Sequence, residues 1–189
     1  MNRGRSLILL FLLPVLAIYN GQCQSTPQTP HQTFHIDLDT QQGHASFWRY
    51  DDIGSATTLH ATVKISAVRK DPKWLPVFMI TLRSQGPSPV ESVKIQFAAP
   101  KKSPPLMILV GRYNASGDPI EQQVVNKTLD LDAGIDIDVD WSTQGSVTFK
   151  IGDAGSYSFK VPWKIETVEV SSSTGEMIVD PLVMGDSTN

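Results

Sequence analysis

Three aspartates alternate along one predicted strand and have the clearest chemical potential in this sequence. Asp136, Asp138 and Asp140 are separated by single apolar residues, so on a β-strand their carboxylates share one face about 7 Å apart. A retaining glycosidase needs two carboxyl groups about 5 Å apart, which makes these aspartates candidate catalytic residues. The alternative, which we favour, is a solvated outer face on which Lys150 and Lys160 pair with the aspartates across neighbouring strands.

Aromatic residues form a second group of candidates. Flat apolar faces of a sugar pack on aromatic rings, while its hydroxyl groups reach polar groups at the ring edges. The candidate ligand-binding residues are Trp48, Tyr50, Trp74 and Tyr113. The loop Asp71-Pro72-Lys73 precedes Trp74 and favours a surface position for it. Trp141 and at least one other tryptophan are expected to fill the core instead.

Metal, nucleophile and nucleotide chemistry have no supporting motif in the chain. The single cysteine, Cys23, excludes a disulfide framework and a cysteine-based zinc site. A Gly-x-Ser-x-Gly nucleophile motif and a phosphate-binding glycine loop are both absent from the sequence. We therefore expect no cofactor and no metal centre in the site. A structural calcium ion stays open, because Asp130 and Asp132, with Asp180 or Asp37, supply the oxygen donors that calcium prefers.

Length and charge limit the classes of function. The 189 residues include 16 Lys+Arg and 19 Asp+Glu, for a net charge of −3, which argues against a general nucleic-acid binder. The length indicates one domain. With 40% hydrophobic and 19% charged residues, the chain can build a core and does not have the composition of a disordered protein.

The N-terminus has the pattern of an export signal. Arg3 and Arg5 precede the apolar run Ser6–Ile18, which is too short to cross a bilayer core of about 30 Å but fits a signal peptide. We expect cleavage after Cys23, with cleavage after Ala17 as the alternative. Lipidation of Cys23 is disfavoured because the residue before it, a glutamine, is not small. We expect a periplasmic or secreted protein with no membrane span after cleavage.

The expected organisation has four parts. A signal peptide covers residues 1–23, and a polar, proline-bearing flexible leader covers 24–32. A single β-sandwich domain covers residues 33–185, and a short tail covers 186–189.

Apolar residues recur with a period of two from Phe34 onward, which predicts β-strands and no helices. Turn residues such as Gly, Pro, Asp and Ser separate about twelve such segments. The expected strands are Phe34–Asp39, Ala45–Tyr50, Leu59–Val68, Val77–Leu82, Ser92–Phe97, Leu106–Tyr113, Gln122–Lys127, Ile135–Trp141, Val147–Ile151, Tyr157–Val161, Ile165–Val170 and Met177–Met184. This pattern predicts an all-β, antiparallel two-sheet sandwich, with three consecutive strands from Gly134 to Val161 forming a meander.

Two segments carry a resemblance to a known group. The strand Ile135–Trp141 ends in tryptophan, a polar turn with Gly145 follows, and the strand Val147–Ile151 leads into Gly152-Asp153. This order resembles the concanavalin A-like (laminin-G-like) jelly rolls. Met177–Met184 is similar to that group's closing strand, which pairs beside the first strand, here Phe34–Asp39. The resemblance implies a jelly-roll fold and a carbohydrate context, since the group includes lectins and glucanases.

Three functions follow as hypotheses. The favoured one is an exported, non-catalytic binding module that contacts glycan or another cell-envelope component. A small polysaccharide hydrolase or lyase is the first alternative, and a periplasmic inhibitor or immunity-type interaction protein is the second. The five glutamates downstream of Cys23 are not paired with a second acid on one strand face, so we lean against an enzyme. The oligomeric state and the ligand stay open.

Overall fold

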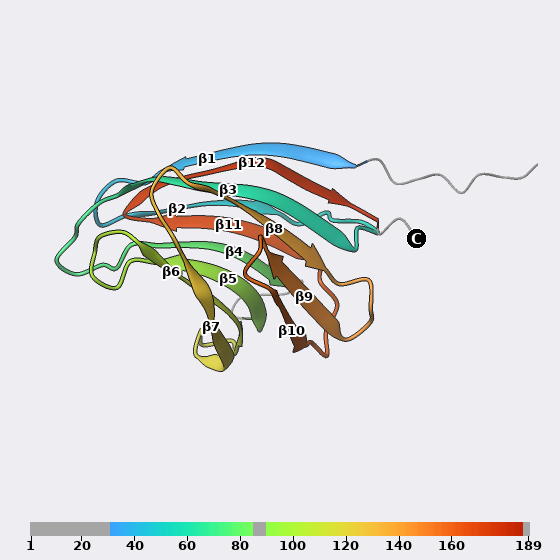
Figure 1. Cartoon of the computed structure of the whole chain (residues 1–189). Coiled ribbons are helices and arrows are strands. Elements are labelled where there is room, and N and C mark those ends of the chain that lie inside the picture. The colour runs from blue at the N-terminus through green and yellow to red at the C-terminus, as the bar shows by residue number, and fades with distance from the viewer. Residues whose placement is uncertain (1–30, 85–89, 187–189) are drawn as a thin grey trace, which may run out of the picture.

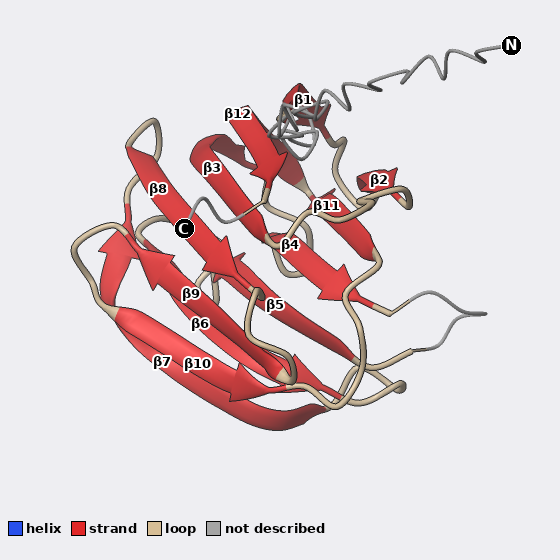
Figure 2. Ribbon diagram, turned by 90° about the vertical axis from the view of Figure 1, so that its right-hand side faces the viewer, coloured by secondary structure: helices blue, strands red, loops and turns tan. Residues whose placement is uncertain are grey.

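The computed structural model describes residues 31–84 and 90–186 and folds them into a β-sandwich. Twelve strands form two six-stranded sheets, and every hydrogen-bonded pair of strands is antiparallel. The predicted all-β sandwich of about twelve strands is therefore confirmed. Figure 1 shows the two sheets as stacked layers, and Figure 2 shows the same layers from one side. Within these residues no helix is long and apolar enough to cross a bilayer.

The two sheets alternate repeatedly along the chain. The first sheet contains, in spatial order, β1 (Gln32–Asp39), β12 (Gly175–Gly185), β3 (Thr58–Val68), β8 (Gly134–Asp140), β9 (Ser146–Ile151) and β10 (Ser156–Lys160). The second contains β2 (Ala45–Tyr50), β11 (Thr167–Ser173), β4 (Val77–Arg83), β5 (Ser92–Ala98), β6 (Leu106–Tyr113) and β7 (Pro119–Leu129). Residues 1–30, which include the expected signal peptide, lie outside the described residues, and β1 begins at the last residue of the expected leader.

Two predicted pairings are confirmed. The closing strand β12 lies beside the first strand β1, with Phe34 opposite Leu182. β8, β9 and β10 form the expected meander, in which each strand pairs with the next. Both pairings place segments with matching apolar stripes next to each other, so one face of each pair can be buried.

The core lies between the sheets and is built by the alternating apolar residues. In β8, for example, Ile135, Ile137 and Val139 are buried, while the aspartates between them point to solvent. Phe78 and Phe97 from the second sheet and Phe149 and Phe159 from the first are among the largest fully buried side chains. Burial of these side chains is the main stabilising contribution to such a sandwich.

One connection differs from the prediction. β10 ends at Lys160 and β11 begins only at Thr167, whereas Val161 and Ile165 were expected to lie in strands. Both residues are buried although they lie outside the ladder. Pro162 has no backbone N–H to donate to a neighbouring strand, so the chain leaves the sheet at this point.

Candidate functional site

The outer face of the second sheet is the candidate functional surface. Figure 1 shows the strands of both sheets arched in the same sense, so this face lies on the hollow side of the arch; we call it the concave face. The strand register places one residue from each of six strands in a single row across it. The row runs Arg49, Glu169, Thr81, Lys94, Gly111 and Gln122.

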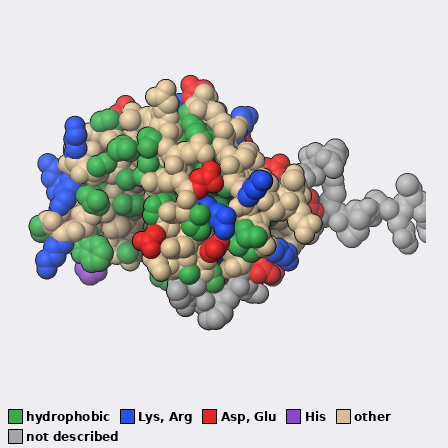
Figure 3. Space-filling model, turned by 90° about the horizontal axis from the view of Figure 1, so that it is seen from below, with side chains coloured by type: hydrophobic (Ala, Val, Ile, Leu, Met, Phe, Trp, Pro, Cys, Tyr) green, Lys and Arg blue, Asp and Glu red, His purple; other side chains and the backbone are tan. Residues whose placement is uncertain are grey.

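This row and the adjoining Arg83 and Tyr113 form the polar half of the concave face. Two residues further along each strand, a second outward-facing row contains Phe47, Ser171, Met79, Gln96, Leu109 and Val124. A third row continues with Val77, Ala98 and Met107. These two rows form the apolar half. Seen from below in Figure 3, acidic and basic side chains gather near the centre of the molecule, and hydrophobic side chains gather to the left.

Glu169 joins two cations in the polar half. Its Oε2 atom accepts hydrogen bonds from Arg49 Nε at 3.0 Å and Nη2 at 2.7 Å, and from Arg83 Nη2 at 2.9 Å. Thr81, directly opposite Glu169 on β4, is buried. One carboxylate thus faces two guanidinium groups, and the surface around it stays positive.

Lys94 and Tyr113 form the centre of the polar half. Lys94 Nζ lies 3.9 Å from the centroid of the Tyr113 ring, in a cation–π contact. Burial lowers the pKa of the Lys94 amine, and the charge of Glu169 opposes this effect. No hydrogen-bond acceptor among the described residues is assigned to Nζ, so its N–H groups are free to meet a ligand.

Two glutamine side chains fix the position of Tyr113 through its hydroxyl group. Its hydroxyl donates to Gln96 Oε1 at 3.1 Å and accepts from Gln122 Nε2 at 2.7 Å. Burial raises the pKa of this hydroxyl, and the bond from Gln122 opposes the rise. Gly111 makes room for the ring: an added Cβ would lie 3.2 Å from Tyr113 Cε2 and 2.5 Å from the backbone oxygen of Glu121.

The structure separates the four aromatic candidates. Only Tyr113 lies in the polar half. Trp48 and Tyr50 stack on each other with a ring-centroid distance of 6.1 Å, and both contact the Phe34 ring, at 5.0 and 5.1 Å. These three partly buried rings pack against the core and fill the gap between the edge strands β1 and β2. Trp74 lies in the connection between β3 and β4 and is 56% exposed.

The aspartate ladder lies on the outer face of the other sheet. Thr62 Oγ1 donates to Asp136 at 2.8 Å, and Ser142 donates its backbone N–H and hydroxyl to Asp140. His60 Nδ1 lies 2.7 Å from Asp138, and Lys150 Nζ lies 4.0 Å from the same carboxylate. The expected cross-strand pairing of Lys150 is confirmed, whereas Lys160 lies on β10, which β9 separates from the ladder, and forms no ion pair with any described residue.

A depression of about 590 Å³ adjoins the ladder at Asp138 and Asp140 and includes His60. These aspartates are two positions apart on a single strand, so their Cα atoms are about 7 Å apart. Each carboxylate is already bonded to a neighbouring strand or turn, as expected for a solvated outer face.

The carboxylates proposed for calcium are dispersed. Asp132 pairs with Lys64 at 3.1 Å, and Asp180 pairs with His35 at 3.0 Å. Across residues 31–84 and 90–186, no three side chains of His, Cys, Asp or Glu are grouped as a metal site would need. We therefore assign no calcium ion to the described residues.

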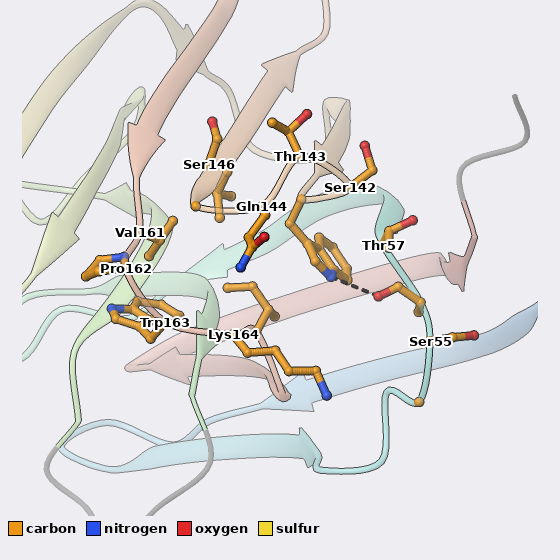
Figure 4. A pocket seen from close by; sticks show the side chains of 16 residues that line it. Ser55, Thr57, Ser142, Thr143, Gln144, Ser146, Val161, Pro162, Trp163 and Lys164 are labelled. Atoms are coloured by element: carbon orange, nitrogen blue, oxygen red, sulfur yellow. Dashed lines mark hydrogen bonds between the residues drawn. The ribbon is translucent and has the colours of Figure 1, made fainter.

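A pocket of about 560 Å³ opens at the end of the sandwich formed by the connections 51–57, 141–145 and 161–166. Figure 4 shows the side chains of Gln144, Trp163 and Lys164 around it. Trp141 Nε1 donates to the backbone oxygen of Ala56 at 2.8 Å, and Trp163 Nε1 donates to Glu91 at 3.2 Å. The same carboxylate accepts from Arg112, and these two bonds lower the pKa of Glu91. Apart from Lys164, the side chains that line this pocket are neutral.

Sequence reasoning missed most of the polar half. Arg49, Arg83, Lys94 and Glu169 are charged residues at alternate positions of otherwise apolar strands, which is the signal that each faces outward. Nothing local to these segments indicates that four different strands bring them together. Their proximity depends on sheet order and register.

Comparisons with solved structures identify the fold. A Bacillus licheniformis β-glucanase superposes with a TM-score of 0.55 over 80% of this chain and 78% of its own, at 10% identity. The Emp47p carbohydrate recognition domain gives 0.52 over 87% and 92%, also at 10% identity. An A. japonicus fructosyltransferase gives 0.58 at 10% identity, but the match spans only 27% of that chain. No family model matches the sequence, and no curated protein matches it significantly. The chain has the concanavalin A-like jelly-roll fold, as the resemblance implied.

Proposed function

We propose that this protein is a non-catalytic glycan-binding module and that the polar half of the concave face binds an acidic glycan. The observation that carries the proposal is Lys94, a half-buried amine on the Tyr113 ring that has no hydrogen-bond acceptor among the residues that the structure describes. A buried cation without an acceptor is costly to keep in a fold. A ligand carboxylate would supply the missing acceptor and recover part of that cost.

The charge balance favours an acidic chain over a neutral one. Arg49, Arg83 and Lys94 lie around a single carboxylate, Glu169, in a protein whose net charge is −3. Ligand carboxylates therefore meet positive potential here, although the net charge of the protein is negative. Gln122 and Gln96 flank Tyr113 and supply amide groups that can bond sugar hydroxyls.

The fold is compatible with this function without proving it. The β-glucanase and the carbohydrate recognition domain share the jelly roll at 10% identity, and one fold supports many activities. The proposal therefore depends on the side chains of the polar half.

Catalysis remains the alternative and has its own test. A polysaccharide hydrolase that used the aspartate ladder would lose activity in Asp138→Asn, and a lyase that used Tyr113 would lose activity in Tyr113→Phe. Release of reducing ends and of unsaturated products from acidic and neutral polysaccharides measures both. Turnover that disappears in either variant would replace the binding-module proposal.

We also infer export to the periplasm or medium, from the pattern of Arg3, Arg5 and Ser6–Ile18. An envelope glycan or protein would then be the partner. Expression of the full chain in a bacterium, followed by mass spectrometry of the extracellular and periplasmic fractions, checks this. A mature chain that begins at Gln24 is the expected result, and a full-length cytoplasmic product would contradict it.

The decisive experiment is calorimetric titration of the protein with oligogalacturonate, with cello-oligosaccharide as the neutral counterpart. We expect binding of the acidic chain only, and at least about a tenfold loss in Lys94→Met, the loss that removal of one charge-assisted hydrogen bond produces. Lys160→Met, an exposed lysine on β10, is the matched control and should bind normally.

Two outcomes would overturn the assignment. Equal affinity of wild type and Lys94→Met for oligogalacturonate would remove the polar half from the site. Binding of the neutral chain that depends on Gln144 would move the site to the end pocket.

A further inference from the structure

A second surface lies at the end of the sandwich opposite the end pocket. The connections at 40–44, 69–76 and 99–105 meet there, and Figure 1 shows the connection between β3 and β4 extending beyond the strands. Figure 3 shows basic side chains gathered at this end, beside the hydrophobic area of the same face. We call the segment 69–76 with Lys101 the basic tip.

Two large apolar side chains are exposed on the basic tip. Trp74 is 56% exposed and Leu75 is 50% exposed. Val77 follows on β4 and begins the apolar half of the concave face. A tryptophan and a leucine in sequence, both facing water, form an apolar contact surface rather than a scattered exposed residue.

The conformation of this tip is held by internal bonds. The carboxylate of Asp71 accepts hydrogen bonds from the backbone N–H groups of Lys73 and Trp74, both at 2.8 Å. The bond from Trp74 is the main cause that lowers the pKa of Asp71. Lys102 Nζ donates to the backbone oxygens of Asp71 and Pro72, which ties the connection at 99–105 to this loop. Trp74 is therefore presented by an ordered turn.

The charges on the tip are unbalanced. Lys70, Lys73 and Lys101 are exposed, and none of the three forms an ion pair with any described residue. The nearest acid in the loop, Asp71, is only 9% exposed because its carboxylate is turned toward the backbone. The surface thus offers three free cations around two exposed apolar side chains.

We propose that the basic tip docks on the surface of an anionic lipid bilayer. Tryptophan is favoured at the level of the lipid headgroups, where its ring is partly apolar and its N–H stays polar. Lysines beside it gain about 1 kcal/mol each from anionic headgroups. Insertion of one or two apolar side chains alone gives only weak membrane binding, and the attraction between the lysines and the anionic headgroups strengthens it.

A bilayer suits this surface better than a protein groove or a glycan does. The apolar residues sit on a protruding loop, which can enter a planar interface, whereas a partner segment would need a groove. Thr81, in the polar row, is four residues beyond Val77 on β4, or about 14 Å away. The polar half therefore stays clear of the membrane, and this proposal does not depend on glycan binding.

Sedimentation with lipid vesicles tests the proposal on the processed protein. The vesicles are phosphatidylcholine with one third phosphatidylglycerol, and pure phosphatidylcholine vesicles are the comparison. We expect partition onto the anionic vesicles with a blue shift of tryptophan emission. Trp74→Ala should weaken partition at least about tenfold, the loss expected when one large apolar side chain no longer inserts. Lys73→Ala should weaken it about fivefold.

Lys160→Ala, which changes an equally exposed lysine far from the tip, is the matched control and should partition normally. Trp74 and Lys73 are exposed, so an unchanged melting temperature will show that the variants are folded. Equal partition of wild type and Trp74→Ala, or equal binding to neutral and anionic vesicles, would overturn the proposal. Retention on dextran sulfate without any partition onto vesicles would do the same, because it would identify an acidic glycan as the occupant.

Discussion

The two halves of the concave face lie on the same strands and differ in charge, because the charged side chains of the cluster all lie in the polar half. In the polar half, Arg49, Glu169 and Lys94 occupy one row of the register. Two residues further along the strands, Phe47 takes the place of Arg49 and Met79 that of Thr81, so the cluster of charges ends there. Both halves belong to one sheet of the same jelly roll, so the fold alone does not distinguish a glycan site from an apolar contact surface. The side chains in each row decide it.

The largest expected effect comes from adding side-chain volume, which the polar half should tolerate less well than the apolar half. Gly111→Val places a Cβ within 2.5 Å of the Glu121 backbone oxygen and against the Tyr113 ring. We expect a loss of about 2–4 kcal/mol in the free energy of unfolding in urea, together with loss of glycan binding. Ala98→Val, on the apolar half, is the matched change and should cost less than about 1 kcal/mol. Equal losses would mean that the polar half is not closely packed.

The next effect concerns the ion pairs of the polar half. Glu169→Gln leaves Arg49 and Arg83 without their shared carboxylate, and we expect a loss of about 1–2 kcal/mol in the free energy of unfolding. Glu121→Gln, an exposed glutamate on β7, should change stability by less than about 0.5 kcal/mol. Urea denaturation of both variants measures the difference. An unchanged free energy of unfolding in Glu169→Gln would show that the cluster of Arg49, Arg83 and Glu169 contributes to binding and not to stability.

We expect the charged Lys94 amine to lower the free energy of unfolding of the protein without ligand. Burial lowers its pKa, so the folded state binds this proton less tightly than the unfolded chain. The cost is therefore full at neutral pH and shrinks as the pH rises through the lowered pKa toward the ordinary value of 10.5. We expect Lys94→Met to raise the melting temperature by about 2–4 °C at neutral pH.

A melting series over increasing pH provides the check on this sign. The gap between Lys94→Met and wild type should narrow as the pH increases. A gap that widens with pH, or a variant that melts below wild type at neutral pH, would show that the amine stabilises the fold.

The smallest effect is expected in the apolar half. Phe47 is 66% exposed, and its ring contacts the Arg49 guanidinium at 5.6 Å. Phe47→Ser should leave the melting temperature nearly unchanged, because little apolar area is buried there. Fluorescence of a hydrophobic dye bound to the folded protein should fall. An equal dye signal would mean that the apolar half is not accessible as one surface.

Local pattern accounted for the strands but not for the site. Each expected strand is present, because the alternation of apolar and polar residues depends only on the two-residue repeat of extended backbone. Trp48 and Tyr50 show the limit of this reasoning. The alternation places them on the opposite face of the strand from Arg49, but it does not say which of the two faces is buried. At the edge strand β2 the two rings turn inward and pack on Phe34.

The resemblance to the jelly rolls implied the pairing of the closing strand with the first, whereas the amino-acid sequence by itself determined the fold class and the approximate number of strands. These follow from short-range periodicity and from apolar stripes that must be buried. Only the tertiary structure decided that Arg49 meets Glu169, 120 residues later in the chain, and that Lys94 lies on Tyr113. The reason is that sheet order and register arise from packing of the whole sandwich, which no segment of the chain encodes alone.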